Sequence, residues 1–148
     1  MNIEKLIKSV MKSEGFSTTL YKCPADKWTI GFGRNVESNG IRKDEALYML
    51  KNDLLDIKLN LEDKLEWFYK LDDVRQNVLI EMAYNMGVSG LLKFRNTLLL
   101  INIGDFEKAS KEMLNSKWHR DFQKFAPKFK VSQLRSSKLS EILRKGEY

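Results

Sequence analysis

A carboxylate, Glu14, ends the first segment of the chain whose apolar residues recur with the period of an α-helix. Asn2 as a cap and Gly15 as a stop predict a helix over residues 3–14. On this helix Glu14 continues the apolar stripe, and burial and the negative end of the helix dipole would both favour its protonated form. A protonated carboxylic acid can act as a general acid on a leaving glycosidic oxygen. The alternative is a Glu14 side chain on the helix rim, in contact with water or a lysine.

A thiol and a hydroxyl, Cys23 and Thr29, follow in a segment rich in threonine and aromatic residues. Residues 24–26 are predicted to form a turn, and residues 28–33 a strand that closes a small hairpin. Cys23 is the single cysteine, which excludes an intramolecular disulfide, and His119 is the single histidine. Together they provide too few soft ligands for a structural zinc site, so we expect no metal and no cofactor.

The run from Glu14 to Gly33 resembles the active-site signature of the phage-type lysozyme (endolysin) family, the glycoside hydrolases that include the T-even phage lysozyme. In that family a glutamate is followed, after eight intervening residues, by aspartate or cysteine, and after five more by threonine inside a Thr-Ile-Gly-x-Gly strand. Glu14, Cys23 and Thr29 match this spacing. The similarity continues over nearly the whole chain, at Asn39-Gly40-Ile41, Asp44-Glu45-Ala46, Val74-Arg75, Asn85-Met86-Gly87, Gly90, Phe94, Asn96, Leu98 and Lys117-Trp118.

The resemblance implies an endolysin muramidase, which hydrolyses the β-1,4 bond between N-acetylmuramic acid and N-acetylglucosamine in bacterial peptidoglycan for host cell lysis. Glu14 would protonate the leaving oxygen, and Thr29 would orient the attacking water or, alternatively, only satisfy the backbone. Cys23 stands where relatives carry aspartate. It acts as base or nucleophile if Lys22 and Lys27 lower the pKa of its thiol; otherwise Asp26 substitutes or Cys23 only shapes the site. Inversion and retention both remain open.

Other site residues follow from the same resemblance. Arg135 matches a family arginine that pairs with the catalytic glutamate, although it could be one more solvated arginine. Arg34 stands where many relatives have histidine, which indicates a different ion-pair partner. Tyr84, Asn85 and Thr97 match positions that line the family's cleft, so we expect them to bind sugars through their polar groups, with core packing as the alternative for Tyr84.

The fold is predicted to be α+β and mostly helical, with a small N-terminal hairpin lobe joined by a long helix to a larger helical lobe. Residues 1–148 are expected to form a single lysozyme-like domain, with roughly 13–60 as hairpin lobe and connecting helix, and 1–12 with 61–148 as helical lobe. Patterns and caps predict helices from about 43 to 65, 73 to 86 after Asp72, 97 to 101, 106 to 115 after Asp105, and 132 to 144 before Gly146.

The net charge of +6 makes an anionic partner plausible, although most lysines are expected simply to be solvated. A basic run near the C-terminus is a candidate for contact with anionic cell-wall or outer-membrane polymers: Lys124, Lys128, Lys130, Arg135, Lys138, Arg144 and Lys145. No nucleic-acid recognition motif is present, and a monomer is expected. The first residues resemble neither a signal peptide nor a membrane span, so we expect synthesis in the host cytoplasm and passage through a holin.

Three other functions compete with the muramidase. A lytic transglycosylase would also depend on one glutamate but would leave an anhydro sugar. A catalytically impaired relative that only binds the cell wall is a second alternative, because Cys23 replaces the usual aspartate. A basic nucleic-acid-binding helical module is the third, and it rests on the sequence charge alone.

Overall fold

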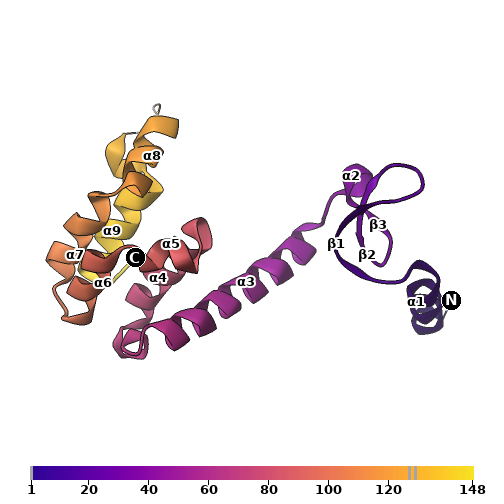
Figure 1. Cartoon of the computed structure of the whole chain (residues 1–148), viewed down its shortest axis with the longest axis horizontal. Coiled ribbons are helices and arrows are strands. Elements are labelled where there is room, and N and C mark those ends of the chain that lie inside the picture. The colour runs from indigo at the N-terminus through magenta and orange to yellow at the C-terminus, as the bar shows by residue number, and fades with distance from the viewer. Residues whose placement is uncertain (1, 127, 129) are drawn as a thin grey trace. The chain divides into compact units, whose positions relative to one another are not determined.

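The computed structural model describes residues 2–126, 128 and 130–148, and the chain divides into two compact units, Met1–Met49 and Leu50–Tyr148 (Figure 1). Mostly helical with one small antiparallel sheet, it confirms the predicted α+β class. The N-terminal unit contains α1 (Ile3–Glu14), β1 (Ser17–Lys22), β2 (Trp28–Gly31), β3 (Arg34–Asn35), α2 (Val36–Asn39) and the start of α3 (Lys43–Lys64). The C-terminal unit contains the rest of α3, η1 (Phe68–Lys70), α4 (Asp73–Met86), α5 (Val88–Leu92), α6 (Arg95–Asn102), α7 (Phe106–Leu114), α8 (Lys117–Phe125), η2 (Val131–Gln133) and α9 (Arg135–Lys145).

Helix α1 begins and ends where the sequence predicts. The Asn2 side chain accepts a hydrogen bond from the Lys5 N–H at 3.0 Å, and Gly15 ends the helix with φ +69°. None of its residues is buried, and the apolar side chains of Ile3 and Ile7 are 51% and 49% exposed. Within the N-terminal unit, the apolar face of α1 therefore does not pack into a buried core.

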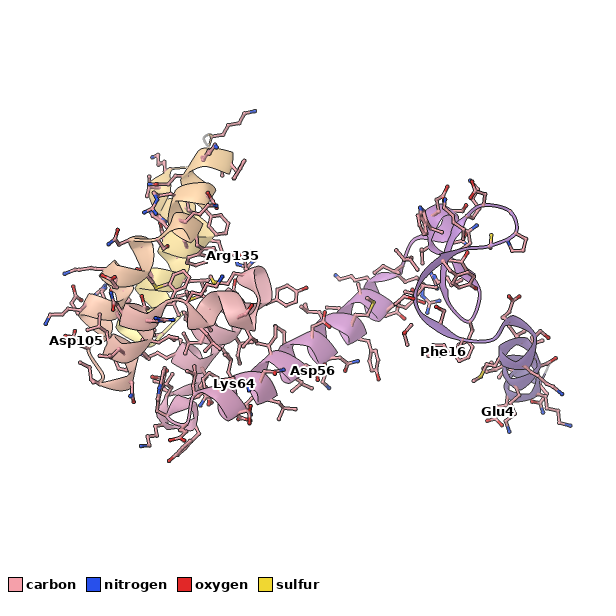
Figure 2. All side chains as sticks on the ribbon, viewed as in Figure 1. Glu4, Phe16, Asp56, Lys64, Asp105 and Arg135 are labelled. Atoms are coloured by element: carbon pink, nitrogen blue, oxygen red, sulfur yellow. The ribbon has the colours of Figure 1, made fainter. Side chains whose placement is uncertain are left out.

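The sheet has the order β1-β2-β3, with both pairs antiparallel. Lys22 pairs with Trp28 at the turn end of the hairpin, and Thr29 pairs with Asn35 of β3. The ring of Phe16, just before β1 (Figure 2), has its centroid 4.8 Å from that of Phe32, just after β2. The hairpin was predicted, but β3 was not, because two residues are too short a run for a periodic pattern.

The core of the C-terminal unit forms around α4. As predicted, Asp72 caps this helix by accepting from the Arg75 N–H at 2.9 Å, and Gly87 ends it. The buried apolar residues come from the end of α3 and from η1, α4, α5, α6, α7 and α9, and α7 lies beside α9 (Figure 1). The main buried side chains are Leu61, Phe68, Val78, Leu79, Met82, Leu91, Ile101, Met113, Leu139 and Leu143.

The guanidinium of Arg75 joins three helices of this unit. Its Nε donates to the Leu143 carbonyl at 2.8 Å, near the end of α9, and Nη1 forms an ion pair with Asp72 at 2.7 Å. The same group stacks over the Phe106 ring of α7, 3.7 Å from its centroid. Arg75 therefore satisfies carbonyls at a helix end that would otherwise lack donors.

Several predicted bounds are corrected. Helix α9 begins at Arg135 instead of 132, because Val131–Gln133 form a tight 3-10 turn and Leu134 is extended. Helix α6 begins at Arg95 instead of Thr97. Helix α8 was missed, although Ser116 caps it by accepting from the His119 N–H at 3.2 Å.

Among the helices in the described part of the chain, none is both long enough and apolar enough to cross a membrane.

Candidate active site

The carboxylate of Glu14 lies against the turn between β2 and β3. A Cβ atom added to Gly33 would be only 2.5 Å from Glu14 Oε2 and 2.8 Å from its Cδ. Gly33 also has φ +76°, so a side chain there would be strained as well as in collision. The loop through Gly15 therefore folds the end of α1 back onto the sheet that carries Thr29, the residue that the sequence grouped with Glu14.

Cys23 follows β1 and is held by its backbone. Its N–H donates to the Lys27 carbonyl at 3.0 Å, and its own carbonyl accepts from the Asp26 N–H at 2.8 Å. The backbone N–H of Lys27 is the largest influence on the thiol and lowers its pKa; partial desolvation opposes this, while the Ala25 N–H adds to the lowering. The thiolate is thus more accessible near neutral pH than in an ordinary cysteine.

The sequence suggested that the ammonium groups of Lys22 and Lys27 could lower the pKa of Cys23. They are not the main cause of the lowered pKa. Lys27 Nζ forms an ion pair with Glu37 at 3.2 Å, and Lys22 Nζ lies 3.8 Å from the same carboxylate. These charges are engaged with Glu37, so the main effect on Cys23 comes from a backbone dipole instead. The carboxylate of Asp26, the proposed substitute, is 89% exposed at the hairpin tip and lies 3.8 Å from Lys22.

Thr29 is buried, with 2% of its surface exposed. Its Oγ1 donates to the Lys27 carbonyl at 2.9 Å. The sequence left two roles open for this hydroxyl, and this contact is the one in which it satisfies the backbone instead of orienting a water molecule. The same carbonyl accepts from the Cys23 N–H. The structure therefore brings Cys23 and Thr29 together on one peptide group, and the lone pairs of the Thr29 oxygen remain available as acceptors.

The partner of Arg34, which the sequence left open, is Glu45. Arg34 Nη1 donates to Glu45 Oε1 at 2.7 Å, and its Nε donates to the Gly40 carbonyl at 3.0 Å. Glu45 also accepts from the Arg42 N–H at 2.7 Å. This cluster joins the end of the sheet to the first turn of α3, so Arg34 has a structural role in the N-terminal unit.

In the C-terminal unit, Arg135 at the start of α9 forms an ion pair with Glu81 at 2.9 Å (Figure 2). The pair lines a hollow with Tyr84, whose side chain is 44% exposed, so Tyr84 is not a core residue. Glu81 was missed by the sequence analysis, although it lies three residues before Tyr84 on the same face of α4. The other residues of this hollow are Leu50, Leu54, Asn77, Ile80 and Tyr148.

The three predicted sugar contacts do not share one hollow. The Asn85 amide oxygen accepts from Trp118 Nε1 at 2.7 Å, and Thr97 is buried at the start of α6 with 2% exposed. Thr97 lines a second hollow whose polar groups were not predicted: Lys93, Arg95, Asn96, Glu112, Asn115 and Ser116. In the residues that the structure describes, no three His, Cys, Asp or Glu side chains gather as metal ligands would.

Similarity to known proteins covers most of the chain. The phage lysozyme family matches residues 11–146. The chain is 25% identical over 122 residues to an endolysin of Acyrthosiphon pisum secondary endosymbiont phage 1, with 79% of each chain covered. It is 29% identical over 143 residues to probable T4-type lysozyme 1 of Dictyostelium discoideum, covering 76% of this chain and 84% of that protein. An endolysin of Bacillus phage B103 is 32% identical over 129 residues, which cover 81% of this chain but 46% of the relative.

The matched range contains Glu14, Cys23 and Thr29, all residues of the Thr97 hollow and all but Tyr148 of the Tyr84 hollow. The chain therefore belongs to the phage lysozyme family and is a lysozyme-type cell-wall hydrolase.

Proposed function

We propose that the protein is a muramidase that cleaves the β-1,4 bond between N-acetylmuramic acid and N-acetylglucosamine, with Glu14 as its general acid. The observation that carries the proposal is the position of the Glu14 carboxylate, which lies beside Gly33 in the turn between β2 and β3. Strand β2 also contains Thr29. Glu14 is exposed, as the rest of α1 is, so the burial expected from the sequence is not found; its carboxylate beside Gly33 is open to a bound glycan, whose leaving oxygen it could protonate.

In the proposed reaction the Glu14 proton moves to the glycosidic oxygen while the bond from that oxygen to the anomeric carbon breaks. Water attacks the anomeric carbon, and the Cys23 thiolate accepts the proton that the water loses. Thr29 would orient this water through the lone pairs of its hydroxyl oxygen. The lowered pKa of Cys23 supports a base at this position, and the exposure of Asp26 makes that residue less suited to the task.

Glycan strands would extend over polar groups of the C-terminal unit. We propose that Tyr84 contributes its exposed ring and hydroxyl, that Thr97 acts with the polar residues of its hollow, and that Arg135 supports the Tyr84 hollow through its ion pair with Glu81. Asn85 would bind sugar through its amide N–H₂, because its oxygen already accepts from Trp118. Amides, hydroxyls and flat apolar faces are the usual lining of a carbohydrate site.

We propose that the biological role is that of an endolysin, as two of the relatives are named. It would be made in the host cytoplasm, pass the membrane through a holin and lyse the host as a monomer. The exposed basic residues of α8 and α9 would add weak attraction to anionic wall or outer-membrane polymers. Nucleic acid is not an expected partner.

Product analysis of purified peptidoglycan tests the proposal. The wild type should release fragments with reducing N-acetylmuramic acid ends, and Cys23→Ser should release them more slowly because a serine hydroxyl is a far weaker base. Anhydro ends would instead identify a transglycosylase. Wall binding without turnover would identify a binding relative, and salt-sensitive retention on DNA without turnover would favour the nucleic-acid-binding module.

A further inference from the structure

Glu37, which the sequence did not single out, binds the turn end of the hairpin. It lies on the short helix α2, and its Oε2 accepts from the Trp28 N–H at 3.0 Å. Its Oε1 accepts from Lys27 Nζ at 3.2 Å. Helix α2 follows directly on β3, which ends at Asn35, the partner of Thr29. The backbone of β3 ends before it can accept a hydrogen bond from the Trp28 N–H of β2. The Glu37 carboxylate accepts that bond instead.

The peptide group between Lys27 and Trp28 connects Glu37 with the candidate catalytic residues. In a trans peptide the carbonyl and the N–H point in opposite directions. On one side of this group the Trp28 N–H donates to Glu37. On the other side the Lys27 carbonyl accepts from the Cys23 N–H at 3.0 Å and from Thr29 Oγ1 at 2.9 Å. One peptide plane therefore carries the hydrogen bonds of all three residues.

We propose that Glu37 is a positioning residue for the hydrolytic site: by fixing the Lys27–Trp28 peptide plane, its carboxylate holds Cys23 and Thr29 in place. The inference rests on the proposed function only in treating Cys23 and Thr29 as the groups that handle water. The side chain of Glu37 binds Lys22, Lys27 and the Trp28 N–H, so it acts on Cys23 and Thr29 through the shared peptide and is not itself a catalytic residue.

The charge of Glu37 suits this role. The Trp28 N–H is the largest influence that lowers the pKa of its carboxyl, and the Lys27 ammonium adds to the effect, so the group stays ionised across the neutral range. Hydrogen bonds to an ionised acceptor are stronger than neutral ones, and bonds in a chain polarise one another. A carboxylate therefore orients the shared peptide better than water would.

Alkylation of Cys23 tests the proposal without requiring turnover. Cys23 is the single thiol, so the rate of its reaction with iodoacetamide, taken at pH 7 relative to pH 10, reports how well the Lys27 N–H stabilises the thiolate. The informative pair is Glu37→Gln and Glu37→Ala. Both remove the charge, but glutamine keeps an acceptor for the Trp28 N–H and alanine does not.

We expect Glu37→Ala to give a relative rate about 3- to 10-fold lower than Glu37→Gln. A Lys27–Trp28 peptide that is free to rotate no longer fixes Lys27, whose own N–H, in the preceding peptide group, lowers the pKa of the thiol. Glu45→Ala, which removes a carboxylate paired with Arg34 in the same unit, should leave the relative rate at the wild-type value. Equal rates for the alanine and glutamine variants would overturn the proposal. An equal loss in Glu45→Ala would also overturn it, since general loosening would then explain the effect.

Peptidoglycan turnover separates this inference from the proposed function. If the wild type releases reducing ends, Glu37→Ala should lower kcat more than Glu37→Gln while KM changes little, because the sugars are bound elsewhere. If the wild type releases none, the muramidase proposal fails, yet the difference in alkylation between the two variants still shows that Glu37 positions Cys23.

Discussion

Glu14 and Gly33 are in contact, and the absence of a side chain at position 33 makes that contact possible. A Cβ there would lie 2.5 Å from Oε2 of the carboxylate. Glu14 is thus held by the turn that joins β2 to β3, which is also the turn that ends the strand carrying Thr29.

Gly33→Ala should therefore cause a large loss of turnover but only a small loss of stability. The substitution costs about 1–2 kcal/mol for a side chain at positive φ, and displacement of the carboxylate should lower kcat by about 100-fold. Gly31→Ala is the matched control, because Gly31 has φ +66° but no atom within 4 Å of an added Cβ. Thermal melts and turnover of both variants check this. A similar loss of activity in both would show that backbone strain, and not the contact with Glu14, is responsible.

Arg75 should be irreplaceable by lysine in the C-terminal unit. An ammonium cannot donate at once to the Leu143 carbonyl and Asp72 while stacking flat on Phe106, so Arg75→Lys should lower the free energy of unfolding by about 1.5–3 kcal/mol. Arg144→Lys, at a side chain that is 38% exposed, should leave the urea midpoint nearly unchanged. Equal midpoints for the two variants would contradict this role.

His119 should make stability fall on acidification. Its ring is 7% exposed, and Nδ1 lies 2.7 Å from Ser136 Oγ. Desolvation first, and then the charge of Arg120, lower its pKa below 6.5, so the unfolded chain binds a proton more readily than the native protein does. Stability from this group is complete above pH 6.5 and is lost as the pH falls from there through the native pKa. Urea melts from pH 7.5 to 5 should show a smaller decline for His119→Asn, and parallel curves would refute the assignment.

The grouping of residues 1–12 with 61–148 remains a prediction, and the exposed apolar face of α1 allows a test. We expect this face to be covered in the native protein, so that Ile7→Ser lowers the free energy of unfolding by about 2 kcal/mol. Lys8→Ser introduces the same residue on the polar side of α1 and should have little effect. If both variants melt alike, α1 contributes no burial and the grouping is wrong.

Local signals predicted much of the fold. Caps at Asn2, Asp72 and Asp105 and stops at Gly15 and Gly87 lie where the sequence placed them, because a side-chain acceptor or a positive φ is a property of one residue. Helix α8 was missed because charged residues interrupt its apolar positions, although Ser116 was a usable cap signal.

The site was predictable only in part. Motif spacing singled out Glu14, Cys23 and Thr29 as candidates, but it could not show that a backbone N–H of Lys27, more than any ammonium group, lowers the pKa of Cys23. Nor could it identify Glu37 or the Glu45 partner of Arg34, because both contacts depend on where the chain returns after β3. Contacts of this kind are set by tertiary structure and leave no periodic trace in the sequence.

The most direct test of the central claim compares Glu14→Gln with the wild type on purified peptidoglycan. Glutamine keeps the size of the side chain but has no acidic proton, so release of reducing N-acetylmuramic acid ends should fall by about 100- to 10,000-fold. The melting midpoint and binding to insoluble peptidoglycan should stay close to those of the wild type. Release within a few-fold of the wild-type rate would contradict Glu14 as the general acid.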